Sequence, residues 1–186
     1  MAQKRKNRII IPCRFAYFNC WRPSSIYGNN KYSMSAIISK DDTETLDSIY
    51  DAIEYVKEKS MTKWGGRIPS NLKSPLHDGD EEKPENPNYR NCFYLNAKCN
   101  DQPQIVDRKV RPITDPTEVY SGCYGNISLI FYGYNCSGNK GIGVWLGNIQ
   151  KTKDGTPIGG RITAKDEFLP VKDTEDVEGS YYGYDE

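Results

Sequence analysis

The segment YGNISLIFYGYN, residues 124–135, alternates between two kinds of side chain with a period of two. Ile127, Leu129 and Phe131 point to one side and form a face that belongs in an apolar core. The other side carries Tyr124, Asn126, Ser128, Ile130, Tyr132 and Tyr134. This alternation predicts a strand with one buried face. Threonine, lysine or glutamate would serve as well on a face that met only water, so the three tyrosines raise the question of what that face contacts.

The same period of two predicts several more strands. We expect them at 9–18, 32–40, 92–99, 104–107, 119–135 and 142–151, with 104–107 paired to 92–99. Outside the segment 124–135, the side chains expected to point inward are Ile9, Ile11, Cys13, Phe15, Tyr17, Met34, Ala36, Ile38, Phe93, Leu95, Ala97, Ile142, Val144 and Leu146. The turn CSGNKG joins the last two long strands.

One helix and one long excursion interrupt the strands. Asp41 and Asp42 offer an N-cap, and helical spacing continues to about Ser60. The apolar positions of this helix are Leu46, Ile49, Tyr50, Ile53 and Val56. Residues 61–91 contain four prolines and three glycines, which predicts an excursion with little regular structure. Excursions of this size in a folded domain are usually functional or mobile.

These elements predict a mainly β protein with one domain. The expected architecture is an OB-fold-like, curved, five-stranded barrel with one helix, the long irregular excursion and a disordered acidic C-terminal tail. Glycines at 125, 133, 143 and 147 fit a strongly bent barrel wall. We expect a basic N-terminal arm at 1–8, the barrel domain at 9–168 and an acidic, aromatic tail at 169–186.

Charge is distributed unevenly along a chain whose net charge is zero. Eight acids stand against one base from residue 166 onward, which leaves the preceding body with 24 bases and 17 acids. A basic body that carries an acidic tail is compatible with a nucleic-acid partner. The tail is too polar and too charged to fold by itself.

Several functional classes are disfavoured by the residues that are missing. The six cysteines form no CxxC pair and His77 is the only histidine, so no metal site is expected, and buried free thiols are expected at Cys13 and Cys99. The acids of HDGDEE, residues 77–82, could hold Mg²⁺ for a nuclease, but a solvated turn explains them better. In SGNKG a glycine follows the lysine where a phosphate loop needs Ser or Thr. We therefore expect no enzyme, no catalytic residue and no cofactor.

The location of the chain is predicted from similar absences. No apolar run is long enough for a membrane span, and no apolar signal core follows the basic start. A cytoplasmic protein without a membrane partner is expected, which means the cytoplasm of the host cell if a phage encodes the chain. The sequence does not reveal whether the chain forms a homo-oligomer.

Three predicted strands place aromatic, amide and basic groups on their non-core faces. Stacking a base on an aromatic ring contributes about 1–3 kcal/mol whatever the base, and neighbouring cations bind phosphates and release counterions. The predicted stacking residues are Tyr94, Tyr124, Tyr132, Tyr134 and Trp145, with glycines leaving both faces of the Trp145 indole open. The predicted basic and polar contacts are Arg14, Asn96, Lys98, Arg108, Arg111, Asn126, Lys140 and Lys151.

Two alternatives use the same residues. Outward tyrosines can pack beneath a loop such as 61–91 and never meet a ligand. The tyrosine face can also be a protein interface, in an interaction module or a virion component, because tyrosine is enriched in such interfaces.

Three segments of the chain resemble a known family. LHDGDEEKPENPNYRNCFYLNAK (76–98), PQIVDR (103–108) and the long run PITDPTEVYSGCYGNISLIFYGYNCSGNKGIGVWLGNIQKTKDGTPIGGR (112–161) are similar to tailed-phage single-stranded DNA-binding proteins that were long catalogued as a domain of unknown function. The resemblance runs from about Ile9 to Phe168. It implies an OB-fold that coats transient single strands in phage DNA replication or recombination, without catalysis.

The two ends of the chain lead to separate expectations. The acidic tail is expected either to compete with DNA for the basic groove or to recruit phage or host replication proteins. Tyr181, Tyr182 and Tyr184 would anchor such a partner. The basic start, with Lys4, Arg5, Lys6 and Arg8, is either a DNA-binding arm or a solvated end.

Overall fold

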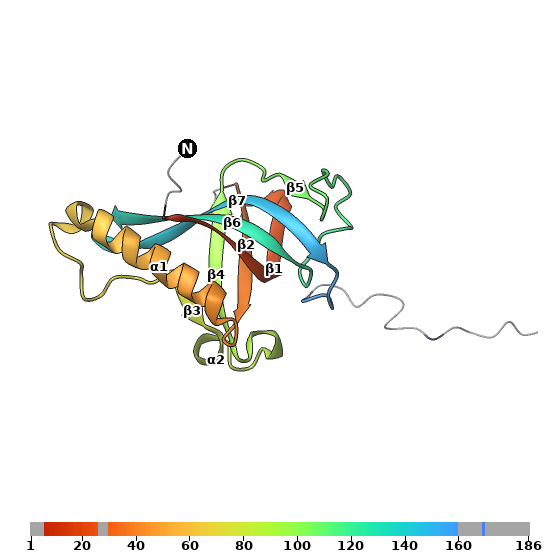
Figure 1. Cartoon of the computed structure of the whole chain (residues 1–186), viewed down its shortest axis with the longest axis horizontal. Helices are drawn as coiled ribbons and strands as arrows, with labels where there is room; N and C mark the ends of the chain where they lie inside the picture. Colours follow the sequence, from red (N-terminus) through yellow and green to blue (C-terminus); the bar gives the residue numbers. More distant parts are fainter. Residues whose placement is uncertain (1–5, 26–29, 160–168, 170–186) are drawn as a thin grey trace, which may run out of the picture.

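Five strands close into a barrel, and this barrel positions the other elements (Figure 1). The structure is a computed structural model and describes residues 6–25, 30–159 and 169. The barrel strands are β1 (Arg8–Ser24), β2 (Lys31–Ser39), β4 (Cys92–Cys99), β6 (Tyr124–Cys136) and β7 (Asn139–Lys153). They pair in the order β4, β2, β1, β6, β7, and a parallel pairing of Lys98 in β4 with Trp145 in β7 closes the ring. The predicted OB-fold-like five-stranded barrel is confirmed.

The predicted alternation places most core residues correctly. The barrel interior contains Ile11, Cys13, Phe15, Met34, Ala36, Ile38, Leu95, Ala97, Ile127, Leu129, Phe131, Ile142, Val144 and Leu146, all buried. Strand β4 has the predicted boundaries. All six cysteines are free thiols; Cys13 is buried, as expected, and Cys99 is only partly buried. Burial raises the pKa of the Cys13 thiol far above its ordinary value.

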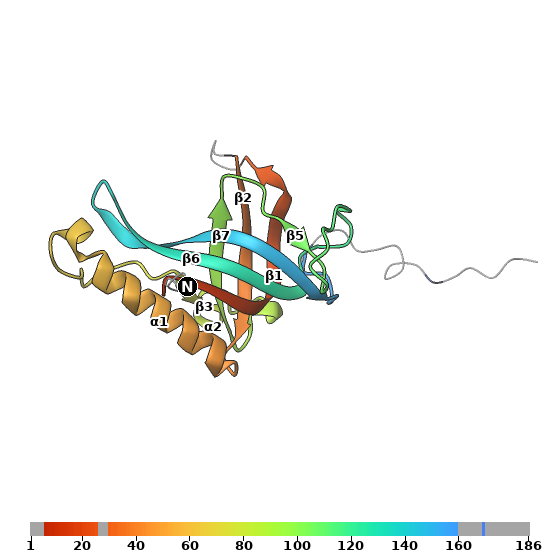
Figure 2. The same ribbon diagram turned by 45° about the horizontal axis from the view of Figure 1, so that its top comes forward.

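Helix α1 (Thr43–Lys59) begins and ends where the sequence predicts. The Asp42 carboxylate accepts a hydrogen bond from the Thr45 backbone N–H at 3.1 Å and so caps the helix N-terminus. Leu46, Ile49, Ile53 and Val56 are buried against the barrel, whereas Tyr50 is exposed. Figure 2 shows that α1 runs beside the β6–β7 hairpin, whose far end extends beyond the barrel. We call this end of the hairpin, residues 131–144, the arm.

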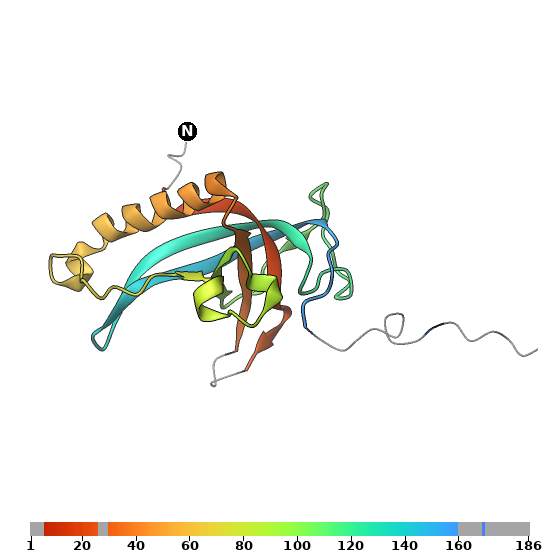
Figure 3. The ribbon, with the colours of Figure 1, turned by 90° about the horizontal axis from the view of Figure 1, so that it is seen from below.

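Residues 61–91 contain more regular structure than the sequence predicts. They form η2 (Met61–Trp64), β3 (Leu76–Asp78), α2 (Gly79–Glu82) and η3 (Pro87–Tyr89), and β3 pairs with β4. Figure 3 shows α2 and the turns around it lying across the barrel strands. Tyr89 is completely buried there against Ala16 of β1, Ile37 of β2 and Tyr94 of β4. This part of the excursion therefore covers a patch of the barrel's outer face.

Two strand predictions need correction. Residues 104–107 were expected to pair with 92–99, but β5 (Ile105–Val106) pairs in parallel with Ile149 and Gln150 of β7. The reason is that β4 meets β7 only at Trp145, so the later part of β7 keeps an edge that β5 can occupy. Residues 119–123 form a turn rather than the start of a strand, and Gly122 within it has a φ of 120°.

Tyr17 is the third correction. It was expected to point into the core, but the ring is 57% exposed. The β1–β2 register is interrupted between Ala16 and Asn19, and Tyr17 has a positive φ of 46°. A bulge of this kind changes the face on which a side chain emerges, which the residue pattern alone does not reveal. None of the helices in the described part of the chain combines the length and apolar character that spanning a membrane requires.

Candidate nucleic-acid interface

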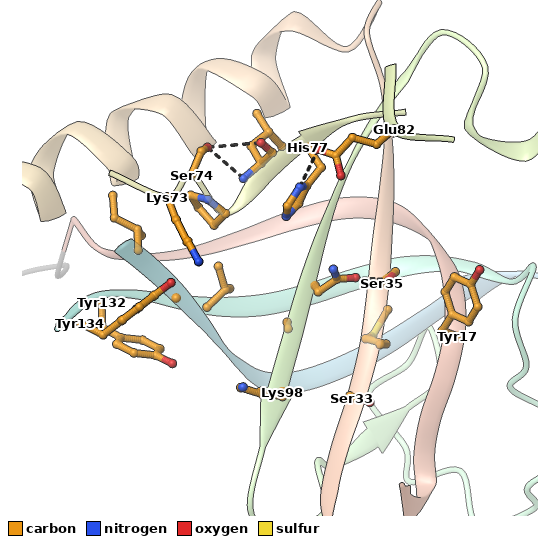
Figure 4. A pocket seen from close by; sticks show the side chains of 18 of the residues that line it. Tyr17, Ser33, Ser35, Lys73, Ser74, His77, Glu82, Lys98, Tyr132 and Tyr134 are labelled. Atoms are coloured by element: carbon orange, nitrogen blue, oxygen red, sulfur yellow. Dashed lines mark hydrogen bonds and ion pairs between the residues drawn. The ribbon is translucent and has the colours of Figure 1, made fainter. Parts of the chain in front are cut away.

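An open groove of about 1080 Å³ crosses the outer face of the barrel, between the arm and the β3–β4–β2 side (Figure 4). β4 and β7 form a strand pairing only at Lys98 and Trp145, and the groove lies where the two strands are no longer paired. The groove is lined by Tyr17, Ser33, Ser35, Lys73, His77, Glu82, Lys83, Asn96, Lys98, Tyr132 and Tyr134, among others. Figure 4 shows Tyr132 and Tyr134 on one side of this space and Tyr17 on the other, with Ser35 and Lys98 between them.

Tyr132 and Tyr134 form the aromatic wall of the groove. Their cross-strand partners in β7 are Gly143 and Gly141. A Cβ atom on Gly143 would lie 2.4 Å from Cζ of Tyr132, and one on Gly141 would lie 2.5 Å from the Tyr134 hydroxyl. Each ring therefore lies flat across a glycine. Burial and the neighbouring Tyr134 raise the pKa of the Tyr132 hydroxyl, which keeps it neutral at ordinary pH.

The arm that carries these rings is fastened to η2. The Trp64 indole donates a hydrogen bond to the Tyr134 carbonyl at 2.9 Å, and Lys63 Nζ donates to the Gly133 carbonyl at 3.1 Å. A Cβ on Gly133 would lie 2.4 Å from the Ser60 hydroxyl oxygen. These contacts bind the edge of β6 beyond the end of β1 and hold the aromatic wall in place.

Trp145 lies beside the wall, but in a different environment from the one predicted. Its ring stacks on Tyr132, with centroids 5.3 Å apart and an interplanar angle of 26°, and Lys31 Nζ lies 5.5 Å from its centroid. The glycines were expected to leave both faces of the indole open. That expectation is wrong, because Gly143 accommodates Tyr132 and a Cβ on Gly147 would meet the Ser128 hydroxyl at 2.1 Å.

The cations of the groove include two lysines without a partner. Lys73 and Lys98 are exposed, and neither ammonium group has a hydrogen bond or ion pair with any described residue. Asn96, next to Lys98 on the same face of β4, accepts a hydrogen bond from the Ser35 hydroxyl. Unpaired ammonium groups beside exposed rings can bind phosphate oxygens without first breaking an internal ion pair.

Tyr94 does not contribute to the aromatic surface as predicted. Its ring is 5% exposed, stacks on His77 at 5.0 Å and meets the edge of Tyr89 at 5.2 Å. Its hydroxyl donates to the Glu82 carboxylate at 2.9 Å. Burial, with the Glu82 charge, raises the Tyr94 pKa to about 12. The excursion 61–91 covers this tyrosine, which is the alternative that the sequence left open.

A second group of predicted residues lies near the opposite end of β6. Tyr124 is about 26 Å along the strand from Tyr132, at roughly 3.3 Å per residue. Its ring lies between the Arg14 guanidinium, 5.6 Å away, and Lys153 Nζ, 4.4 Å away. Arg14 also donates hydrogen bonds to the Asn88 side chain at 3.2 Å, the Thr156 carbonyl at 2.8 Å and the Gly122 carbonyl at 3.4 Å. The guanidinium thus joins several segments of the chain.

Most of the remaining predicted contacts are also engaged within the protein. Asn126 bonds Gln150 at 3.0 Å, and Lys140 Nζ bonds the Trp64 carbonyl at 3.1 Å. Lys151 is paired with Asp154 at 2.7 Å and also bonds the Glu118 carbonyl, while Arg111 is paired with Asp107 at 2.7 Å. Arg108 is exposed and has no partner among the described residues. Tyr181, Tyr182, Tyr184, Lys4 and Arg5 lie outside the described residues.

The acids of the HDGDEE segment are held by groups of this chain. Lys40 Nζ lies 2.7 Å from carboxylate oxygens of both Asp78 and Asp80, and hydrogen bonds from Lys40 lower the pKa of both carboxyls. Glu82 pairs with His77 at 2.8 Å. Within the described part of the chain, no three His, Cys, Asp or Glu side chains are grouped so that they could hold a metal ion.

The groove residues that sequence reasoning missed include Tyr17, Lys73, His77 and Lys83. Lys73 enters the groove through a bridge to Gly141, since its N–H donates to the Lys140 carbonyl at 3.1 Å and its carbonyl accepts from Ile142 at 3.0 Å. Such a contact inside a Pro-rich excursion has no local signal. Tyr17 depends on the bulge in β1, which has no glycine to mark it.

Comparisons with solved structures support the fold. The single-stranded DNA-binding protein from bacteriophage Enc34 matches with a TM-score of 0.68 and 25% identity, over 89% of this chain and 96% of that chain. A structure of that protein in complex with ssDNA matches with a TM-score of 0.72 and 24% identity, over 85% and 97%. The bacteriophage T7 single-stranded DNA binding protein gp2.5 matches with a TM-score of 0.58 and 14% identity, over 95% and 100%.

Comparisons of sequence identify the family. A protein named p50 from Acyrthosiphon pisum secondary endosymbiont phage 1 is 30% identical over 178 residues, which covers 89% of this chain and 94% of the relative. The family model described as "Enterobacter phage Enc34, ssDNA-binding protein" matches residues 7–178. This match spans nearly the whole chain and agrees with the resemblance found in the sequence. The chain therefore belongs to the family of the Enterobacter phage Enc34 ssDNA-binding protein.

Proposed function

We propose that this protein binds single-stranded DNA in the groove between the arm and the β3–β4–β2 side of the barrel, without preference for sequence. The observation that carries this proposal is the combination, in one open groove, of a rigid aromatic wall with unpaired ammonium groups. Tyr132 and Tyr134 stack with bases, and Lys73 and Lys98 bind phosphates. Family membership supports the same ligand.

The chemistry of these contacts accounts for the absence of sequence preference. Every base has a π-face, and each stacked base contributes about 1–3 kcal/mol. Each lysine that neutralises a phosphate releases counterions, so log K falls with log salt by about 0.7 per contact on single strands. Neither interaction reads the hydrogen-bonding edge of a base. A protein of this kind can cover whatever single strand is exposed.

We further propose that the protein coats transient single strands during phage DNA replication or recombination, in the cytoplasm of the host, and that it acts by binding and not by catalysis. The acidic tail would compete with DNA for the groove or recruit replication proteins. Family membership and the charge of the tail support this role.

A titration tests the proposal. Oligo-dT is added to the protein at two salt concentrations while tryptophan fluorescence is followed. Trp145 is the reporter, because it is partly exposed and stacks on Tyr132, whereas Trp64 is buried and Trp21 does not line the groove. The expected result is quenching that saturates and that requires more DNA at the higher salt concentration. A protein-interface role predicts no change in fluorescence, and magnesium-dependent loss of the oligonucleotide would indicate a nuclease instead.

A further inference from the structure

We propose that Tyr17 is a second base-stacking residue, at the end of the groove opposite Tyr132 and Tyr134, and that Lys83 is the positioning residue that holds its ring. This inference rests on the proposed function and adds to it a direction for the DNA path, from the arm to the bulge in β1. Tyr17 and Lys83 both line the groove (Figure 4 labels Tyr17).

Tyr17 occupies the bulge that shifts the alternation of β1, so that Phe18 and Cys20 face the core while the Tyr17 ring stays outside. A φ of 46° is uncommon for a bulky residue and costs free energy wherever it occurs. The residues that follow make the core contacts, and the Tyr17 ring itself is 57% exposed. The bulge turns an aromatic ring away from the core and toward the open groove. A base that stacks there would use the exposed ring that this bulge leaves on the groove side.

Lys83 fixes the ring from the side of the excursion. Its Nζ lies 4.7 Å from the ring centroid of Tyr17, 4.3 Å from that of Tyr89 and 4.6 Å from that of Tyr94. Cation–π attraction acts at these distances. Tyr89 and Tyr94 are buried, so they hold the ammonium group against the barrel, and the ammonium group in turn holds the one exposed ring of the three. The Lys83 ammonium group thus contacts aromatic rings of this chain and is not expected to bind a phosphate.

The groove gives a path between the two aromatic ends. β1 pairs with β6 on one side of the barrel, but the way round through the groove crosses β2, β4 and β7, and at about 4.8 Å per strand this surface between Tyr17 and Tyr132 is roughly 19 Å wide. The groove residues on β2 and β4 are Ser33, Ser35, Asn96 and Lys98. These side chains are small or polar, so a single strand of DNA has room to cross β2 and β4. OB-folds bind about 4–16 nucleotides, so a span of this size fits one bound segment.

The test compares oligonucleotides of increasing length, from dT4 to dT16. Tyr132→Ala is expected to weaken binding at every length, because a short strand occupies the arm end. Tyr17→Ala is expected to leave the shortest bound strands unaffected and to weaken binding of longer strands by roughly 5- to 150-fold, the equivalent of one stacked base. Tyr50→Ala, which removes an exposed ring on α1, is the matched control and should change nothing.

Each contrary outcome has a distinct meaning. No effect of Tyr17→Ala at any length would overturn the inference but leave the proposed function standing. An equal loss at every length would overturn the placement of Tyr17 at the far end of the path. If the unaltered protein bound no oligonucleotide at all, the proposed function and this inference would fail together.

Two further variants separate binding from folding. Tyr17→Gly removes the ring and suits the positive φ, so it should keep or raise the thermal unfolding temperature while it weakens binding of long strands; a fall in both would indicate a structural residue. Lys83→Met should weaken binding of long strands without changing the slope of log K against log salt, and Lys83→Arg should restore binding. A decrease of about 0.7 in that slope for Lys83→Met would make Lys83 a phosphate contact and overturn its positioning role.

Discussion

The two ends of strand β6 carry the same kind of residues on the outer face of the barrel but differ in how far the neighbouring side chains are bonded within the chain. At the arm, Tyr132 and Tyr134 lie across glycines and face an open groove. At the other end, Tyr124 lies between Arg14 and Lys153, and Arg14 is bonded to three other segments of the chain. An aromatic ring beside a cation is therefore part of the proposed ligand site at one end, and at the other end Arg14 makes it part of a structural joint. Of the two cations at Tyr124, Arg14 is bonded within the chain, whereas the Lys153 ammonium group has no hydrogen bond or ion pair with a described residue.

The largest expected effect on DNA affinity comes from removing the tyrosine rings at each end of β6. Replacing both Tyr132 and Tyr134 with Ala should reduce affinity for oligo-dT by about 2–6 kcal/mol, since two stacked bases are lost. Tyr124→Ala is the matched variant, and the affinity of its folded fraction should change little even if its stability falls. Fluorescence titration measures affinity, and thermal unfolding measures stability. A large loss of affinity in Tyr124→Ala would mean that both ends of β6 contact DNA.

A smaller effect is expected when the wall itself is disturbed. Gly143→Ala would place a Cβ 2.4 Å from Cζ of Tyr132, so the ring must move away from β7 and from Trp145. We expect about a tenfold loss of affinity and a change in Trp145 fluorescence in the absence of DNA. Gly138→Ala is the control, because a Cβ there meets nothing within 4 Å, although its φ of 84° lowers stability. Equal affinities for the two variants would show that the pose of Tyr132 does not matter.

The cations give the third test. Lys98→Ala should lower affinity several-fold at low salt and reduce the slope of log K against log salt by about 0.7, because one phosphate contact is lost. Lys151→Ala should leave that slope unchanged, since Lys151 is already paired with Asp154 and bonded to the Glu118 carbonyl. Both residues were predicted from the sequence as DNA contacts. If the slope decreased for Lys151→Ala instead, pairing within the chain would be a poor guide to the binding surface.

The sequence predicts the barrel well because alternation reports local burial directly. Strand β4, helix α1 and the inward residues of β6 and β7 all follow from the spacing of apolar side chains. It predicts the groove only in part. Tyr132, Tyr134, Asn96 and Lys98 line the groove as the face pattern suggests.

The remaining residues could not be placed because their positions depend on contacts between distant segments. Tyr94 is covered by the turn that carries Tyr89, and Arg14 is bonded to Asn88 and Thr156. A period of two shows which way a side chain points from its own strand. It cannot show whether another segment lies above that side chain.

The smallest effect is expected from the acidic tail, and it tests whether the groove has a competitor within the chain. Deleting residues 170–186 removes six acids and one base. We expect the truncated protein to bind oligo-dT a few-fold more tightly at low salt and equally at high salt, because charges more than a Debye length apart are screened. The path of the preceding segment agrees with this expectation. Ile158 packs against the cluster of Ala16, Ile37, Tyr89 and Tyr94, so the segment up to residue 159 lies near the bulge in β1 that carries Tyr17.

A second variant identifies which property of the tail matters. Changing its six acids to the corresponding amides, with Tyr181, Tyr182 and Tyr184 kept, should reproduce the effect of the deletion if charge carries the competition. If only the deletion tightens binding, the tyrosines occupy the aromatic wall in place of bases. Unchanged affinity in both variants would rule out competition and leave recruitment of a partner as the role of the tail. Without a competing tail, the difference in DNA affinity between the two ends of β6 would come from the folded barrel alone.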